Sequence, residues 1–189
     1  MKRLLLTLTI SILSLVGYSQ TSTVNPDTVC YQTSGSIYTV PSLGAGYTYN
    51  WTVLSPGVIT SGVGTNTIGV NWSSASPGLI PNGVTVYAVN AAGCQSLPIT
   101  LNVLIYQVLP TITPIGPFCA GASCVTLVGS PSGGTFTGTG VVGNQFCPTT
   151  SGIGTFTLTY TVTSGGCTFT TTTSVSVTSN PVLSPIQHN

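Results

Sequence analysis

Apolar and polar residues alternate along residues 46–53, which read GYTYNWTV. The large apolar side chains stand at every second position: Tyr47, Tyr49, Trp51 and Val53. Small polar residues fill the positions between them. A period of two predicts a β-strand with one buried face and one solvent face. We therefore expect Tyr49 and Trp51 to lie in the core of a half-buried sheet.

Further short strands are predicted through the first half of the chain. They cover residues 37–40, 58–60, 67–72, 83–90 and 99–105. Groups rich in Gly, Pro, Ser and Asn separate them at residues 55–57, 62–66, 76–78 and 81–83. Apolar residues alternate inward up to Trp72, which joins the predicted core. Strands at this spacing without helical periodicity indicate a β-sandwich.

The second half repeats the strand pattern with threonine on the outer face. Phe156, Leu158, Tyr160 and Val162 alternate with threonines, and a last strand is predicted at residues 169–177. Tyr160 is the core residue expected here. The fold class predicted is all-β, with two tandem immunoglobulin-like β-sandwiches at residues 21–107 and 108–178 and a tail at 179–189.

The first twenty residues have the pattern of an export signal. A basic start at residues 1–3 precedes an apolar run at residues 4–16 and a small-residue exit. This pattern is typical of a cleaved signal peptide, and the apolar run is short for a membrane span. We expect a protein located outside the cell or on its surface, with no membrane span after cleavage.

Charge changes the functional picture once residues 1–20 are removed. Lys2 and Arg3 are the only basic side chains, which leaves Asp27 as the sole acid and His188 as the sole histidine. No basic patch can be built for nucleic acid. General acid–base catalysis and metal binding need groups that this inventory lacks. The sequence predicts no enzyme, no cofactor and no metal.

Six cysteines in an exported chain indicate three disulfides. Cys30 precedes Trp51 and Cys94 follows it, and a tryptophan beside a cystine is typical of immunoglobulin-like cores. This arrangement predicts the pair Cys30–Cys94. The four remaining cysteines allow three pairings. The favoured ones are Cys119–Cys167, which joins an early strand to a late one, and Cys124–Cys147.

Several motifs resemble repeats found in surface proteins of Bacteroidetes. YTYNWTV, SGVGTNTIGVNW (residues 61–72) and AVNAAGC (residues 88–94) resemble PKD-like and immunoglobulin-like repeats. FCAG at 118, GGTFTGTGV at 133, NQFCP at 144 and GGC at 165 resemble a second repeat type of the same proteins. Cys147 departs from the Asn or Asp expected there, which supports its bridge to Cys124. Such repeats serve as spacers, adhesins and binding modules.

The tail repeats the pattern of the linker between the predicted domains. VLPTITPIGPFC (residues 108–119) and NPVLSPIQHN (residues 180–189) both place Pro-Ile after a short apolar–polar alternation. One interpretation is a frayed terminus or a truncated gene. The other is a strand that adds to a neighbouring subunit and gives a filament. The candidate assembly strand comprises Pro181, Val182, Leu183, Ser184, Pro185 and Ile186.

Two short motifs carry less weight. GTGVVG at residues 138–143 fits a dinucleotide-binding pattern, but no helix is predicted after it, so it is interpreted as a glycine turn. Asp27-Thr28-Val29 resembles an O-glycosylation site of Bacteroidetes, which makes Thr28 a candidate, with an ordinary turn as the alternative. The function predicted is an extracellular structural subunit whose partner is itself or another surface protein. The alternative is a monomeric adhesin or carbohydrate-binding module with a glycan partner.

Overall fold

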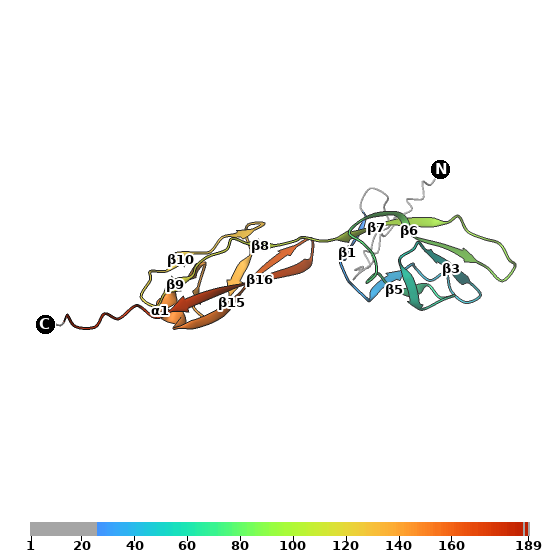
Figure 1. Cartoon of the computed structure of the whole chain (residues 1–189). Helices are drawn as coiled ribbons and strands as arrows, with labels where there is room; N and C mark the ends of the chain where they lie inside the picture. The colour runs from blue at the N-terminus through green and yellow to red at the C-terminus, as the bar shows by residue number, and fades with distance from the viewer. Residues whose placement is uncertain (1–25, 187, 189) are drawn as a thin grey trace, which may run out of the picture. The chain divides into compact units, whose positions relative to one another are not determined.

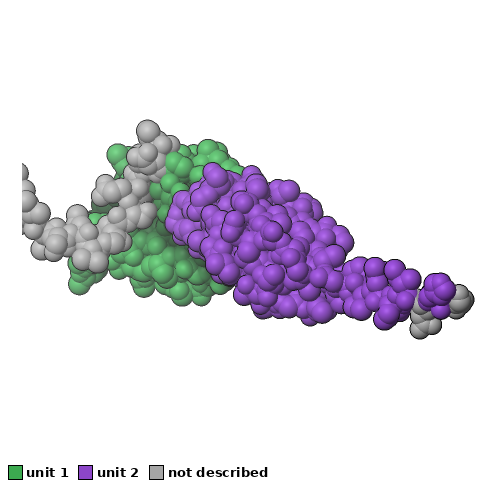
Figure 2. All heavy atoms as spheres, turned by 90° about the vertical axis from the view of Figure 1, so that its left-hand side faces the viewer, with its two compact units in different colours: residues 1–105 green, residues 106–189 purple. Residues whose placement is uncertain are grey.

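The computed structural model describes residues 26–186 and 188, and it divides the chain into two compact units (Figure 1). Unit 1 comprises residues 1–105 and unit 2 comprises residues 106–189 (Figure 2). The signal peptide predicted at residues 1–20 lies outside the described residues. The predicted domain boundary lies two residues after the observed one, because Tyr106 packs against Phe169 of unit 2.

Unit 1 is a sandwich of two β-sheets. Its strands are β1 (Asp27–Cys30), β2 (Ser36–Thr39), β3 (Thr48–Val53), β4 (Val58–Ser61), β5 (Thr67–Asn71), β6 (Gly78–Val89) and β7 (Ile99–Tyr106). One sheet has the order β1-β7-β6-β3 and the other β2-β5-β4. Non-consecutive neighbours in both sheets give the crossed topology of an immunoglobulin-like sandwich, as the sequence predicts.

Strand β6 contains the largest local difference from the predicted elements. It begins at Gly78 and passes through Pro81-Asn82-Gly83, where a turn was expected. The register with β7 shifts between Ile80 and Val84, so the three residues form an irregularity within one long strand. Asn82 has a positive φ of 52° there, and its backbone N–H donates to the Asn102 side-chain oxygen. Turn residues can therefore mark a bulge as well as a strand end.

The core of unit 1 centres on Trp72 rather than on Trp51. Trp72 is fully buried, and its indole N–H donates to the Tyr38 hydroxyl at 3.1 Å. Trp51 is only partly buried because β3 is the edge strand of its sheet. Its side chain still packs against the main core cluster and against a smaller one that contains Tyr49. Tyr49 is buried as predicted.

Unit 2 is organised around one long hairpin. Its strands are β8 (Thr111–Ile112), β9 (Phe118–Cys119), β10 (Val125–Thr126), β11 (Gly129–Ser130), β12 (Thr135–Thr137), β13 (Val141–Val142), β14 (Gln145–Phe146), β15 (Gly154–Ser164) and β16 (Cys167–Thr178). Strands β15 and β16 pair along their whole length in the sheet β12-β15-β16-β9. The remaining strands form a three-stranded sheet, β10-β14-β13, and a two-stranded sheet, β11-β8. A single helical turn, α1 (Pro148–Ser151), was not expected from the sequence.

The inward face of β15 carries the core of unit 2, as the alternation predicts. Leu158, Tyr160 and Val162 are buried. The Tyr160 hydroxyl donates to the carbonyl of Pro131 at 2.6 Å and accepts from the backbone N–H of Gly134 at 2.9 Å. This buried phenol therefore ties the segment between β11 and β12 to the hairpin.

The chain enters and leaves unit 2 at opposite ends of β16. At the entry, the Tyr106 hydroxyl lies 2.8 Å from the Ser164 side-chain oxygen, beside the turn between β15 and β16. At the exit, β9 runs parallel to the last residues of β16, with Cys119 opposite Thr178. Strand β16 covers eleven residue steps from Cys167 to Thr178, or roughly 36 Å at the usual rise.

The pair Cys124–Cys147 is confirmed, with an S–S distance of 2.04 Å. The predicted pair Cys119–Cys167 is wrong. Cys119 is a free, exposed cysteine at the Thr178 end of β16, whereas Cys167 begins that strand. A disulfide needs Cα atoms within about 7 Å, so the length of β16 excludes this bridge.

The predicted pair Cys30–Cys94 is also wrong, because the two residues lie at opposite ends of the unit 1 sandwich. Cys94 is free and exposed in the turn after β6, beside the Thr48 end of β3. Cys30 begins a turn that includes Thr33, and the Thr33 carbonyl accepts a hydrogen bond from the backbone N–H of Trp72. The Trp72 ring and Val53 both lie beside Gly57, so Cys30 is near the Val53 end of β3. Cys30 and Cys167 are each disulfide-bonded.

Candidate interaction surfaces

The polar groups buried in unit 1 form a short chain. The Tyr38 hydroxyl accepts from the Trp72 indole and donates to the Asp27 carboxylate at 3.0 Å. Burial, and then the negative charge of Asp27, raise the pKa of Tyr38 well above its usual range. Within residues 26–186 and 188, no group of three or more metal-ligating side chains gathers. The Tyr38 cluster is a structural tie between β1, β2 and β5, and the sequence analysis missed it.

Tyr38 should make unit 1 sensitive to alkali. Its pKa is higher in the folded state than the ordinary value of about 10. The folded state therefore holds its phenol proton where the unfolded state loses it, and stability falls as pH rises above about 10. The expected slope is about 1.4 kcal/mol per pH unit. Tyr38→Phe should remove this slope, as measured by denaturant unfolding followed by tryptophan fluorescence at pH 9 to 11. Equal slopes in both proteins would contradict the assignment.

Two of the sequence motifs fall on the surface. Thr28 is exposed on β1, so its hydroxyl is accessible, and glycosylation there stays a prediction. The glycine motif at residues 138–143 spans the turns around β13, which pairs with β14. No helix begins at that point among the described residues; α1 starts later, at Pro148. The geometry is that of glycine turns in a β-unit.

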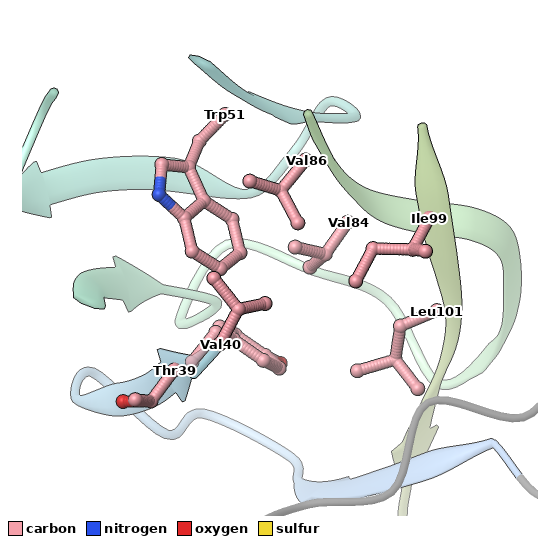
Figure 3. Close-up of a pocket in the computed structure, with 8 residues that line it drawn as sticks. Thr39, Val40, Trp51, Val84, Val86, Ile99 and Leu101 are labelled. Atoms are coloured by element: carbon pink, nitrogen blue, oxygen red, sulfur yellow. The ribbon is translucent and has the colours of Figure 1, made fainter. Parts of the chain in front are cut away.

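An apolar groove opens at one side of the unit 1 sandwich. Its volume is about 310 Å³. We call it the unit 1 groove. Its main lining side chains are Val40, Leu43, Tyr49, Val86, Leu97 and Ile99. A smaller cavity of about 20 Å³ adjoins it and shares Val40, Val86 and Ile99. Figure 3 shows Trp51, Val84, Val86, Ile99 and Leu101 on neighbouring strands of one sheet, with Thr39 and Val40 from the segment of β2 on the other side.

The groove exists because the second sheet leaves part of the first uncovered. Ile99 lies on the same inward face of β7 as Leu101 and Val103, which are both buried. Ile99 is nevertheless 46% exposed. Leu97, at the rim, is 88% exposed. The residues that form the groove come from four separate segments, so no local pattern in the sequence could have identified it.

The candidate assembly strand has no partner within the described chain. Residues 179–186 carry no strand assignment and extend from the body of unit 2 (Figure 2). Val182, Leu183 and Ile186 are 93%, 91% and 101% exposed. Gly121 lies close to Asn180, where the tail begins. The segment therefore presents three large apolar side chains to solvent.

The related segment at residues 110–115 is docked in unit 2. It reads PTITPI, against PVLSPI at residues 181–186. Ile112 pairs with Gly129 of β11, and the backbone N–H of Thr113 donates to the carbonyl of Val128 at 2.9 Å. Ile112 and Ile115 are half-buried, and Ile115 packs against the unit 2 core. The same pattern is thus a docked strand at one place and an exposed segment at the other.

Most of unit 1 resembles a known domain family. Residues 18–103 match the PKD-like domain model. PKD-like domains are generally non-catalytic, and the match indicates an extracellular structural or binding module. The match supports the PKD-like resemblance given by the sequence motifs. Disulfide bonds fit an extracellular location.

Two solved structures that match the chain come from titin. A tandem of titin immunoglobulin domains shares 13% identity at a TM-score of 0.30, with 82% of this chain and 94% of that chain covered. A titin domain pair in complex with telethonin shares 15% identity at a TM-score of 0.29, with 82% and 93% covered. No curated protein matches the chain. Among the described residues, no helix is long and apolar enough to cross a membrane.

Proposed function

We propose that this protein is an extracellular structural subunit that assembles into a filament by strand addition through residues 181–186. The observation that carries the proposal is the exposed PVLSPI segment, which repeats the PTITPI pattern docked as β8. By this comparison Leu183 and Ile186 correspond to Ile112 and Ile115, which are both half-buried in unit 2, and Ile115 packs against the unit 2 core.

The positions of the prolines support one-sided pairing. In a strand, alternate residues direct their backbone groups to opposite edges. In β8, Thr111 and Thr113 face β11, and the prolines at 110 and 114 have the opposite parity. The tail has the same parity, so Val182 and Ser184 can bond to an acceptor while Pro181 and Pro185 face away. Proline on the outer edge of an added strand stops further pairing there.

The exit of the tail supports an open assembly. The tail leaves unit 2 at the end of β16 that is remote from its entry. A contact between a tail and a different surface of the next copy is head-to-tail, and such contacts extend unless a rotation closes them into a ring. Low charge leaves little repulsion between copies: among the described residues, the only carboxylic side chain is that of Asp27 and the only histidine is His188.

Removing the anchors should abolish assembly without unfolding either unit. The oxidised mature chain is expected to form filaments in negative-stain microscopy, and a chain that ends at Thr178 is expected to form none. The full-length variant Leu183→Ser with Ile186→Ser should behave like the truncation, because it removes the two predicted anchors. Val182→Ser is the matched control, since its counterpart Thr111 is exposed and assembly should persist.

Two outcomes would contradict the filament. Monodisperse particles from the full chain would favour the alternative, a monomeric adhesin or carbohydrate-binding module, which glycan-array binding then tests. Filaments from the truncated chain would show that the tail is not the assembly strand.

A further inference from the structure

We infer that the unit 1 groove is the acceptor site for residues 181–186 of a second copy of this chain. This inference rests on the proposed function and names the surface that the function requires. In this contact, the exposed apolar tail of one copy would bind the uncovered apolar surface in unit 1 of another copy.

The groove lies beside an available sheet edge. Among the described residues, β2 pairs only with β5, so its other edge has free backbone groups. Val40 follows β2 directly and lines the groove, and Ile99 on β7 lies across it. A strand added to this edge of β2 would cover the exposed part of Ile99. Both requirements of strand addition, open backbone groups and pockets for alternate side chains, are therefore present at one place.

The groove and the tail match in chemistry. The main lining side chains are aliphatic apart from the Tyr49 ring, and the Tyr49 hydroxyl already accepts from the backbone N–H of Leu43 at 2.6 Å. No charged side chain lines the groove. Leu183 and Ile186 would enter it without leaving a buried charge unpaired. The volume of about 310 Å³ is at the lower end of the range for small binding sites, which suits two aliphatic anchors.

The length of the tail limits how far it can reach along its own unit. Residues 179–186 span at most about 29 Å when fully extended. Strand β16 separates the start of the tail from the entry of unit 2 by roughly 36 Å. The tail therefore falls short of Tyr106, through which the chain arrives from unit 1.

The test places one negative charge at the rim of the groove in the full mature chain. Leu97→Asp should raise the concentration needed for filaments by at least about 100-fold, because docking would bury an unpaired carboxylate. Val63→Asp is the matched control, because Val63 is 80% exposed in unit 1 and does not line the groove. It should assemble like the wild type.

Tryptophan fluorescence verifies that each variant is folded, since both tryptophans lie in unit 1. Leu43→Asp, at another exposed residue of the groove, replaces Leu97→Asp if the latter fails to fold.

The outcomes separate this inference from the proposed function. Filaments from Leu97→Asp at the wild-type concentration, with none from the chain that ends at Thr178, would overturn the groove and keep the assembly strand. A lower unfolding midpoint of unit 1 with unchanged assembly would mean that a segment of the same chain occupies the groove, and would also overturn it. Absence of filaments from the wild type would instead remove the proposed function.

Discussion

Trp72→Ala is expected to lower the free energy of unfolding of unit 1 by about 3–5 kcal/mol. Trp72 is fully buried at the end of β5, and the space around it is closely filled: a side-chain carbon added at Gly57 would approach the indole within 2.4 Å. The substitution leaves a cavity and removes the indole N–H that the Tyr38 hydroxyl accepts. Both losses act on the same cluster.

The measurement is urea unfolding followed by the fluorescence of Trp51, which remains as a probe. Trp51→Phe provides the comparison. Because Trp51 is only partly buried on an edge strand, its replacement should cost clearly less than that of Trp72. A larger loss for Trp51 would restore it as the organising residue of the core and contradict the packing described above.

Replacing Cys124 and Cys147 together by alanine should lower the stability of unit 2 by about 3 kcal/mol. The bridge spans a sequence separation of 23 residues, and in the chain-entropy model it restricts the unfolded chain accordingly. Alanine is chosen because Cys147 is buried. A serine hydroxyl in that apolar environment would itself lower the stability, which would confuse the comparison. Calorimetry of the oxidised protein follows the unit 2 transition, and tryptophan fluorescence follows unit 1, which should not change.

Cys94→Ala and Cys119→Ala are the matched controls for this experiment. Both cysteines are free and exposed, so neither substitution should change stability by more than about 0.5 kcal/mol. A loss of several kcal/mol in unit 1 for Cys94→Ala would reinstate the pair Cys30–Cys94, and the corresponding loss in unit 2 for Cys119→Ala would reinstate Cys119–Cys167.

The strands could be predicted because their signal is local. Alternation with a period of two correctly indicated the burial of Trp72, which directly follows β5, of Ile105 on β7 and of Tyr160 on β15. Which strand lies at an edge is decided by the whole topology, and for that reason the sequence overestimated the burial of Trp51. The bulge in β6 was missed because Pro-Asn-Gly is compatible with both a turn and an irregular strand.

The disulfides and the groove depend on distant contacts. Cys124 and Cys147 are close in sequence and lie on adjoining strands and turns, which made their pairing predictable. Cys119 and Cys167 belong to neighbouring strands, but β9 pairs with the far end of β16, a register that no local pattern reveals. The groove combines residues that follow β2, lie within β3 and β6, and lie around the start of β7. The tail pattern was visible in sequence, and the docked geometry of β8 gave it a physical meaning.

The opposed entry and exit of unit 2 determine how it would carry tension. A force applied through Tyr106 and Thr178 acts along the axes of β15 and β16, whose ladder contains eleven register pairs. Hydrogen bonds loaded in this direction are sheared together, whereas a force across the strands would open them one after another. Rupture under load follows the unfolding rate rather than the equilibrium stability. Unit 2 therefore has the geometry of a tensile link, one that resists extension along the direction in which the chain runs through it.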